Sequence, residues 1–498
     1  MRKNGMLMPV FALPSEYGIG CFSKAAYEFA DLLAEAGQSL WQILPLGPTG
    51  YGDSPYQSFS TFAGNPYFID LEQLMKAGLL SAAECEPLRT PESSPIDYQS
   101  LYQTRFELLK KAYQRSDIHT DPGYQAFCRE QAGWLEDYAL FMAVKAEYGE
   151  GTWHQWEPGI RFRDSEAVLA YRRRLAEEID YYKYLQYLFG QQWLELKAYA
   201  NGKGIEIIGD IPIYVAADSA DVWAHPELFR LDDDYLPTAV AGCPPDSFSA
   251  SGQLWGNPLY DWPVHQEQDY EWWIRRIAHC FSWYDIVRID HFRGFDEYYS
   301  VPYQAATARN GTWCKGPGMD LFAAVRQALG PLRIIAEDLG FLTDSVIQLL
   351  RESGYPGMKV LQFAFDSREE SDYLPHNYHS NCVVYTGTHD NDTLKGWYQN
   401  LKEEDRLMAC LYTNSNPGDE EELHRALICL AMGSVADNCI IPVQDYLGIG
   451  SEGRINTPST LGGNWQWRMP RDAFTGERIR QIKRMTELYG RRGRGEII

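Results

Sequence analysis

The sequence contains no apolar run of about 18 residues, the length that a membrane-spanning helix requires. Near the N-terminus, Arg2 and Lys3 precede a short apolar stretch, but Pro9 and Pro14 interrupt it. A secretory signal needs an uninterrupted apolar core of roughly 7–15 residues, so this pattern argues against one. We therefore expect a cytoplasmic protein with no membrane partner.

Cysteine is sparse and unpatterned, because ten residues are scattered over 498 and none forms a C-x-x-C motif. This distribution argues against a disulfide framework and a cysteine-based zinc site, and it fits buried thiols in a reducing compartment. The ten histidines also lack the spacing of metal ligands. We expect neither a metal nor another cofactor.

Motifs for nucleotide binding and for common hydrolases are missing or fail on inspection. The sequence has no Walker loop, no H-E-x-x-H and no G-x-S-x-G elbow. Residues 448–453 match G-x-G-x-x-G, but Pro458 follows closely and prevents the long helix that a dinucleotide site needs.

Positive charge is in deficit, since 45 Lys and Arg stand against 68 Asp and Glu and the formal net charge is −23. Nucleic acids and anionic membranes attract basic proteins, so this balance argues against both as partners. Aromatic residues are plentiful, with 15 Trp and 33 Tyr. Rings with a polar handle suit the apolar face and hydroxyl edge of a sugar, so the composition permits a carbohydrate ligand.

Three short apolar segments end in carboxylates, which is typical of strands that lead into an active site. The first reaches Asp290, and the same pattern leads to Glu337 and to Asp390. Alone, the first segment also fits a buried ion pair between Asp290 and Arg288 without any chemistry. If the strands share one barrel, however, their carboxyl ends bring all three acids to one rim. Two carboxyls flanking a bond are the minimum apparatus for glycoside cleavage.

The alternation of strand and helix patterns predicts an α/β fold, a (β/α)8 TIM barrel. Eight apolar segments suit its strands, at residues 6–13, 40–44, 205–213, 285–295, 332–336, 359–365, 382–386 and 439–443. Two long excursions follow barrel strands. Residues 49–190 predict a large, mostly helical insertion subdomain, and residues 216–268 predict a lid or substrate loop. We expect a single catalytic unit over residues 1–498, without a separate C-terminal β domain.

Five motifs carry a resemblance to a known family. The segments RIDHFRG (288–294), AEDLG (336–340) and GTHDND (387–392) resemble catalytic regions of the amylomaltase or disproportionating-enzyme family. These are 4-α-glucanotransferases of the α-amylase superfamily. Residues 209–215 and 50–60 resemble two further signature regions. Since the motifs occur in the family's order and extend to Asn464, the resemblance covers nearly the whole chain.

The resemblance implies roles for the three carboxylates. Asp290 takes the position of the nucleophile, and Arg288 can pair with it on the same strand face. Glu337 takes the position of the general acid/base, and its apolar strand and the charge of Asp290 should raise its pKa. Asp390 takes the position of the carboxylate that holds hydroxyls of the distorted sugar.

The resemblance also implies substrate contacts at seven further positions. These are Tyr56, Asp210, Gln253, Trp255, Arg288, His389 and Asn464. For three of them a structural role is the alternative, since Asp210 could be a strand-end carboxylate, Trp255 a core ring and His389 a satisfied histidine.

The leading functional hypothesis is therefore a retaining 4-α-glucanotransferase. It would move α-1,4-glucan segments to the 4-hydroxyl of another glucan or of glucose through a covalent glucosyl-enzyme, with maltooligosaccharides as partners. The alternative is an α-1,4-glucan hydrolase with the same three carboxylates. A glucan-binding protein without catalysis is a third class, which the intact carboxylates disfavour. The oligomeric state is not predicted.

The excursion at 216–268 provides a test of transfer against hydrolysis. Its Gly, Pro and aromatic residues suit a lid that contacts the acceptor and keeps water from the intermediate. Phe248→Ala, or a shortening of 244–252, should therefore raise the ratio of hydrolysis to transfer. The measurement is free reducing ends per transfer event, with maltotriose as donor and acceptor. An unchanged ratio with both rates falling would assign the loop to general substrate binding.

Overall fold

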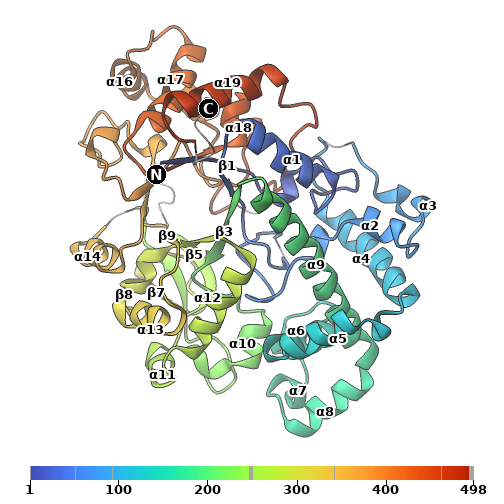
Figure 1. The fold of residues 1–498 in the computed structure, drawn as a ribbon. Helices are drawn as coiled ribbons and strands as arrows, with labels where there is room; N and C mark the ends of the chain where they lie inside the picture. The colour runs from blue at the N-terminus through green and yellow to red at the C-terminus, as the bar shows by residue number, and fades with distance from the viewer. Residues whose placement is uncertain are drawn as a thin grey trace.

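A parallel β-barrel forms the centre of the computed structural model, which describes residues 2–50, 52–91, 93–245, 251–340, 342–460 and 462–492 (Figure 1). Within the described residues its eight strands are β1 (Lys3–Leu7), β2 (Leu40–Gln42), β3 (Glu206–Pro212), β6 (Ile286–Asp290), β9 (Ile334–Ala336), β10 (Gly357–Val360), β11 (Cys382–Tyr385) and β12 (Asn438–Pro442). They lie in the order β10-β11-β12-β1-β2-β3-β6-β9. The amide of Ala336 donates to the carbonyl of Pro356 at 2.9 Å and connects the two end strands. The predicted α/β barrel is confirmed.

Three of the predicted strands are clearly shorter in the structure, and the one expected at 285–295 ends at Asp290, with a 3-10 turn at Phe292–Phe295. The first was expected at 6–13 but spans Lys3–Leu7, where it pairs with β12 from Lys3 onward. It stops before Pro9, which has no amide to donate, and a 3-10 turn follows at Val10–Ala12. The strand expected at 359–365 likewise gives way to a 3-10 turn after Val360.

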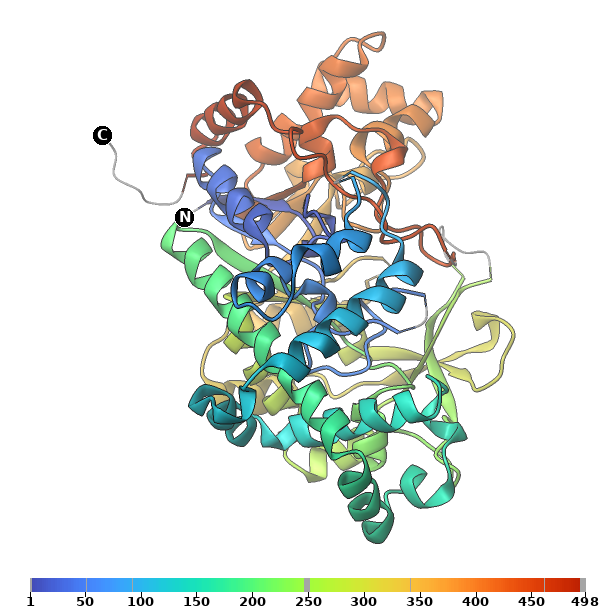
Figure 2. The same cartoon turned by 90° about the vertical axis from the view of Figure 1, so that its right-hand side faces the viewer.

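Helices surround the barrel, as Figures 1 and 2 show. Those between or beside the barrel strands are α1 (Lys24–Glu35), α12 (Glu271–Trp283), α13 (Met319–Leu329), α14 (Asp344–Ser353), α17 (Glu420–Gly433) and α19 (Gly476–Leu488). In α14 the local signals are clear, because the Thr343 side chain accepts from the amide of Val346 and Gly354 ends the helix in a left-handed conformation. Its Val346 and Leu349 are buried on the face toward the barrel.

The region predicted as a mostly helical insertion is helical in the structure. It contains α2 (Leu71–Lys76), α3 (Ala82–Cys85), α4 (Tyr98–Arg115), α5 (Pro122–Glu130), α6 (Ala132–Glu147), α7 (Pro158–Arg161), α8 (Ser165–Arg174) and the first half of α9 (Ala176–Gly202). The expected boundary at residue 190 falls inside α9. This helix packs on α6 of the insertion and on α1 and β3 of the barrel. The insertion and the barrel therefore share one continuous helix.

A small antiparallel sheet beside the barrel mouth was not predicted. Among the described residues it has four strands in the order β5-β4-β7-β8. They are β4 (Ala239–Cys243), β5 (Gln253–Pro258), β7 (Glu297–Pro302) and β8 (Thr312–Lys315). The expected lid at 216–268 thus supplies two strands, together with α10 (Ala220–Ala224) and α11 (Trp262–Glu267). Phe248, which the lid prediction invokes, lies outside the described residues.

The C-terminal part of the chain is helical and returns to the N-terminus. It includes α15 (Leu394–Asn400), α16 (Glu403–Thr413) and α18 (Val443–Leu447). After β12 the described residues contain no further strand, in agreement with the expected absence of a C-terminal β domain. The buried guanidinium of Arg491 donates to the carbonyls of Lys3, Met432 and Ser434 at 3.1, 2.7 and 3.1 Å, which fixes the end of α19 beside β1.

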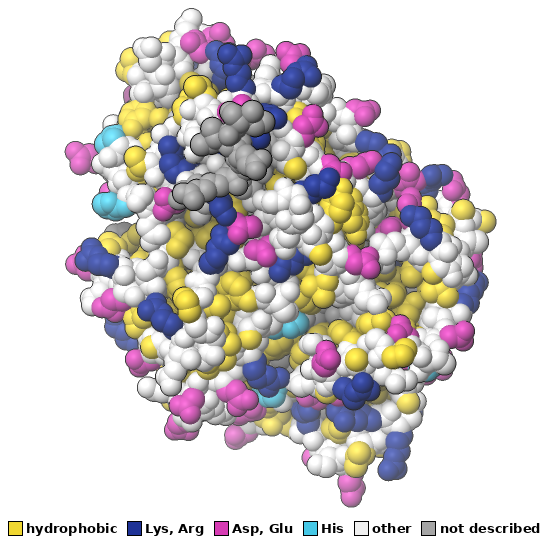
Figure 3. All heavy atoms as spheres, viewed as in Figure 1, with side chains coloured by type: hydrophobic (Ala, Val, Ile, Leu, Met, Phe, Trp, Pro, Cys, Tyr) yellow, Lys and Arg dark blue, Asp and Glu magenta, His cyan; other side chains and the backbone are white. Residues whose placement is uncertain are grey.

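The surface carries charges of both signs close together. On the face in Figure 3, acidic and basic side chains are interspersed rather than gathered in separate fields. None of the helices in the described ranges is long and apolar enough to cross a membrane.

Gly209 in β3 provides a test of packing next to Asp210. A Cβ atom at this position would lie 2.2 Å from Cγ of the buried Tyr284 ring. Gly209→Ala should therefore lower the free energy of unfolding by about 1–3 kcal/mol, the usual cost of overpacking a core. In the control Gly202→Ala, at the end of α9, a Cβ meets nothing within 4 Å. That change should be neutral or stabilising by up to about 1 kcal/mol. Thermal unfolding at one scan rate compares the two, and equal melting temperatures would contradict the steric argument.

Candidate active site

Arg288 lies at the centre of the cluster of ionisable residues inside the barrel mouth. Asp210 and Arg288 are directly paired across β3 and β6, so both side chains face the barrel interior. Nη1 of Arg288 donates to Oδ1 and Oδ2 of Asp210 at 2.7 and 2.6 Å. Its Nη2 lies 3.0 Å from Oδ1 of Asp290. The Arg288 side chain is 3% exposed and that of Asp290 28%, so the ion pair is buried while Asp290 reaches the cleft.

Charge and burial act in opposite directions on this pair. Burial disfavours a charged guanidinium, but Asp210 and Asp290 outweigh it and raise the pKa of Arg288 well above its ordinary value. Burial disfavours the charged carboxylate of Asp210 and raises its pKa above the ordinary value, although the adjacent Arg288 acts against this. A charged pair of this kind is costly to break, since either partner alone would be an uncompensated buried charge.

Glu337 lies at the end of β9, beside Asp290. The amide of His291 donates to its Oε2 at 2.6 Å and the amide of Leu339 to its Oε1 at 2.9 Å. Burial, followed by the negative charge of Asp290, raises the pKa of Glu337 to about 8, although Arg288 and the two amides act against this. Glu337 is therefore mostly protonated at neutral pH and can donate a proton at the cleft.

Asp390 follows β11 and is held by the adjacent His389 and by the neighbouring segment 454–456. Nδ2 of Asn456 donates to its Oδ1 at 2.6 Å, and Nε2 of His389 lies 3.3 Å from the same oxygen. The guanidinium of Arg454 donates to the carbonyl of Asp390 at 2.8 Å. The Asp390 side chain remains 44% exposed. Its carboxylate is thus oriented from one side and open on the other, as a group that binds hydroxyls must be.

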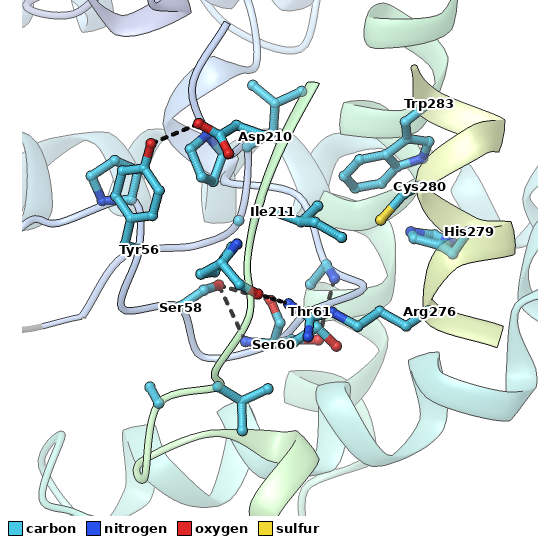
Figure 4. Close-up of a pocket in the computed structure, with 18 of the residues that line it drawn as sticks. Tyr56, Ser58, Ser60, Thr61, Asp210, Ile211, Arg276, His279, Cys280 and Trp283 are labelled. Atoms are coloured by element: carbon cyan, nitrogen blue, oxygen red, sulfur yellow. Dashed lines mark hydrogen bonds between the residues drawn. The ribbon is translucent and has the colours of Figure 1, made fainter. Parts of the chain in front are cut away.

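Tyr56 joins the two halves of this cluster. Its hydroxyl donates to Oδ2 of Asp210 at 2.8 Å, as Figure 4 shows. Burial and the charge of Asp210 raise the pKa of Tyr56 well above its ordinary value, so the hydroxyl keeps its proton. The ring stacks on His389, with centroids 5.1 Å apart and planes at 15°. Trp465 lies tilted against both rings, at 6.0 and 5.9 Å. These rings form an aromatic wall beside the carboxylates.

Three of the expected substrate-binding residues lie outside this network of direct contacts. Trp255 and Gln253 come from β5 of the small sheet, and Nε1 of Trp255 donates to Oε1 of Gln253 at 3.2 Å. Trp255 reaches the site through His291, whose ring it meets edge to face at 4.8 Å. The side chain of Asn464 bonds within its own loop, where it accepts from the amide of Thr457 at 3.0 Å. The structure thus links Trp255 to the residue after Asp290 and places Gln253 beside Trp255, while Asn464 lies in the loop next to Trp465.

Sequence reasoning missed several residues that contact the acids. Asn456 and Arg454 come from the segment that follows the rejected G-x-G-x-x-G motif, where nothing in the spacing connects them to Asp390. No signal in the sequence singles out Trp465. His291 stood inside the RIDHFRG motif, but a histidine after the expected nucleophile had no role of its own in the sequence.

A pocket lies beside Asp210, and its lining shares Tyr56 and Asp210 with the network of the carboxylates. It has a volume of about 50 Å³ and is enclosed by β3, the chain at 45–63 and α12 (Figure 4). Tyr56 and Asp210 line one end, and Arg276 and His279 of α12 line the other. The volume suits one or two water molecules rather than a sugar. Within the described part of the chain, no group of three or more His, Cys, Asp or Glu side chains is arranged to hold a metal ion.

Comparison with known proteins identifies the family. Residues 8–473 match the family described as 4-alpha-glucanotransferase. The 4-alpha-glucanotransferase of Clostridium butyricum is 47% identical over 487 residues, which cover 97% of this chain and 100% of the relative. The chloroplastic/amyloplastic 4-alpha-glucanotransferase of Solanum tuberosum is 41% identical over 99% of this chain and 86% of its own. The structure of the amylomaltase from Streptococcus agalactiae in complex with acarbose has a TM-score of 0.95 at 42% identity, and the match covers 99% of this chain and 100% of that one. The chain therefore belongs to glycoside hydrolase family 77, the amylomaltases or 4-alpha-glucanotransferases (EC 2.4.1.25).

Proposed function

We propose that this chain transfers α-1,4-glucan segments with retention of configuration, using Asp290 as nucleophile and Glu337 as general acid/base. Asp290 attacks the anomeric carbon of the donor while Glu337 gives its proton to the departing glycosidic oxygen. The bond to the leaving chain breaks, and a covalent glucosyl-enzyme forms. The 4-hydroxyl of an acceptor then attacks the same carbon and gives its proton to Glu337, which releases Asp290 and completes the cycle.

One observation supports this proposal. Of two neighbouring carboxyls, one lies in surroundings that favour its ionised form and the other in surroundings that favour its protonated form. Asp290 is paired with Arg288 at 3.0 Å, which suits a carboxylate. Glu337 is buried beside it with a pKa raised to about 8, which suits an acid. Environments that divide two carboxyls in this way are the pattern by which acid and nucleophile are recognised.

The remaining residues are proposed to hold the sugar. Asp390 and His389 face the cleft from the loop after β11, and hydroxyls of a distorted ring offer partners for both. The ring of Tyr56 offers a stacking surface beside them, since it already stacks on His389. Gln253 and Trp255 would contact the acceptor from β5, and Asn464 would do so from the loop beside Trp465.

The proposed partners are α-1,4-glucans and maltooligosaccharides. Support comes from the Streptococcus agalactiae amylomaltase, whose structure holds acarbose, a maltooligosaccharide mimic. Hydrolysis is the competing outcome for the same glucosyl-enzyme, because water can replace the acceptor hydroxyl. Trp255 of the small sheet packs on His291, the residue after Asp290. The sheet would thus give the acceptor an ordered surface beside the catalytic pair, which supports transfer. A cytoplasmic location is part of the proposal, since all ten cysteines carry free thiols.

The pH dependence of the rate tests the assignment of Glu337. The reaction needs its protonated form, so the alkaline limb of kcat/KM should begin at a pH of about 8, with a fall of about tenfold per unit above it. The measurement is glucose release from maltotriose between pH 5 and 10, with circular dichroism to show that the fold persists. If the decline with rising pH begins near pH 5, or if the rate stays constant to pH 10, the result would contradict a proton donor with this pKa.

Maltotriose also tests the reaction itself. The wild type should convert it to glucose and a ladder of longer maltooligosaccharides, whereas a hydrolase would give only glucose and maltose. Asp290→Asn should lower turnover by at least a thousandfold, about 4 kcal/mol in the barrier. Asp338→Asn is the matched control, because Asp338 adjoins Glu337 but accepts from the amide of Met358 at 2.6 Å. It should keep activity within about tenfold. An Asp290→Asn variant as active as this control would remove Asp290 from the role of nucleophile.

A further inference from the structure

His291, which follows the proposed nucleophile, has an uncommon backbone conformation. Its φ and ψ are 52° and 47°, in the left-handed region, which residues other than glycine occupy uncommonly and Asn, Asp and His more often than the rest. Such a conformation persists where the surrounding structure fixes it, and it clusters at functional sites. The amide of His291, at the end of β6, donates to Oε2 of Glu337 at 2.6 Å, and the left-handed turn then directs the following residues back toward Glu337. The next amide, of Phe292, donates to the Glu337 carbonyl at 2.9 Å.

The carboxyl of Glu337 is consequently held at both oxygens. The Leu339 amide bonds to Oε1 at 2.9 Å and the His291 amide to Oε2. The first of these comes from the chain of Glu337 itself. The second comes from the residue that follows Asp290 at the end of β6, so the His291 amide ties this carboxyl to the strand that carries the nucleophile. Hydrogen bonds from amides favour the ionised form, which Glu337 adopts after it has released its proton.

The ring of His291 lies between the barrel and the small sheet. Trp255 of β5 meets it edge to face, with centroids 4.8 Å apart and planes at 83°. Nε2 is buried and has no hydrogen-bond partner within the described residues. Burial lowers the pKa of His291 to about 4, so the ring is neutral at neutral pH. It contributes to the site by packing rather than by charge.

Because Gly294 has no side chain, there is room beside it for the His291 ring. A Cβ at this position would lie 3.2 Å from Cδ2 of His291 and 2.8 Å from Cδ1 of Ile213. The backbone of Gly294 is not in the left-handed region, so an alanine is allowed there apart from these contacts. This position can therefore be used to disturb the ring without changing His291 itself.

We propose that His291, in its left-handed conformation, is a positioning residue for glucan transfer. Its backbone amide orients the carboxyl of Glu337, and its ring supports Trp255 on the acceptor side. The proposal rests on the assignment of Glu337 as acid/base. His291 acts through two other residues and does not touch the reacting atoms. In this arrangement one residue connects the nucleophile's strand, the acid/base and the small sheet.

A pair of substitutions separates the amide from the ring. His291→Asn removes the ring but keeps a residue that tolerates the left-handed region, so the amide should stay on Glu337. It should raise the ratio of hydrolysis to transfer by about two- to tenfold, the worth of one aromatic pair, and leave the alkaline limit of the pH profile in place. His291→Val also removes the ring, but its β-branch disfavours the conformation and displaces the amide.

The valine variant should therefore show a further effect on Glu337. Loss of an amide donor raises the pKa of a carboxyl, so the alkaline limit should move upward by about one unit. The kcat should fall by about tenfold relative to His291→Asn. The other titratable groups that act on Glu337 are Asp290, Arg288 and Tyr373, and neither substitution changes them. If the valine variant does not fold, His291→Ala takes its place with a smaller shift in the same direction.

Two further variants separate positioning from general packing. Gly294→Ala should raise the ratio of hydrolysis to transfer less than His291→Asn does, because the added Cβ presses first on Ile213 and shifts the His291 ring only slightly while the amide remains. His265→Asn is the matched control, since His265 is buried, also has a pKa lowered to about 4 and packs on Tyr260, away from the acids. It should lower the melting temperature and change neither the ratio nor the pH limit.

The outcomes that would overturn the proposal are distinct for each part. Equal alkaline limits and equal kcat in folded His291→Asn and His291→Val would remove the amide's role. A wild-type ratio in both His291→Asn and Gly294→Ala would remove the ring's role. Separately, a Glu337→Gln variant that keeps wild-type turnover would refute the acid/base assignment itself, whatever the His291 variants show.

Discussion

The buried pair of Arg288 and Asp210 is the interaction on which the rest of the site depends. A guanidinium inside a barrel is tolerable only with carboxylates around it, and its fork reaches Asp210 on β3 and Asp290 on its own strand. Asp210 in turn fixes Tyr56, and Tyr56 provides the surface against which His389 stacks. The position of Asp290 and the shape of the aromatic wall therefore follow from one charge balance in the core.

The same charge balance divides the roles of the acids. Asp290 lies next to Arg288 and partly in solvent, whereas Glu337 is buried and faces the charge of Asp290. Removing Arg288 would leave Asp210 and Asp290 as uncompensated neighbours and would raise the cost of ionising either. Catalytic competence here is thus a property of the arrangement of four ionisable groups, and no single carboxylate has it alone.

Sequence reasoning recovered what is local and failed where contacts are distant. The barrel strands and the acids at their ends were predictable, because β-branched runs that end in Asp290, Glu337 and Asp390 carry the signal within a few residues. The small sheet was not, since β4 pairs with β7 almost sixty residues later and the short β8 has a mainly exposed, non-alternating pattern. Asn456 was equally hidden, because a loop asparagine gains its role only through the fold. The raised pKa of Glu337 could be anticipated from its apolar strand, whereas the amide of His291 depends on a backbone conformation that sequence does not display.

The continuity of α9 has a mechanical consequence for the mouth of the barrel. The helix runs from the insertion into the barrel wall without a proline, and its backbone hydrogen bonds cross the junction uninterrupted. Because the helix is continuous at this junction, the insertion and the barrel are rigidly connected, and the side of the cleft beside α9 is stiff. The small sheet, by contrast, is connected to the barrel by loops, since β4 and β5 lie in the chain between β3 and β6, and β7 and β8 in the chain between β6 and β9. Displacements at the mouth of the barrel are therefore expected on the side of the small sheet rather than along α9.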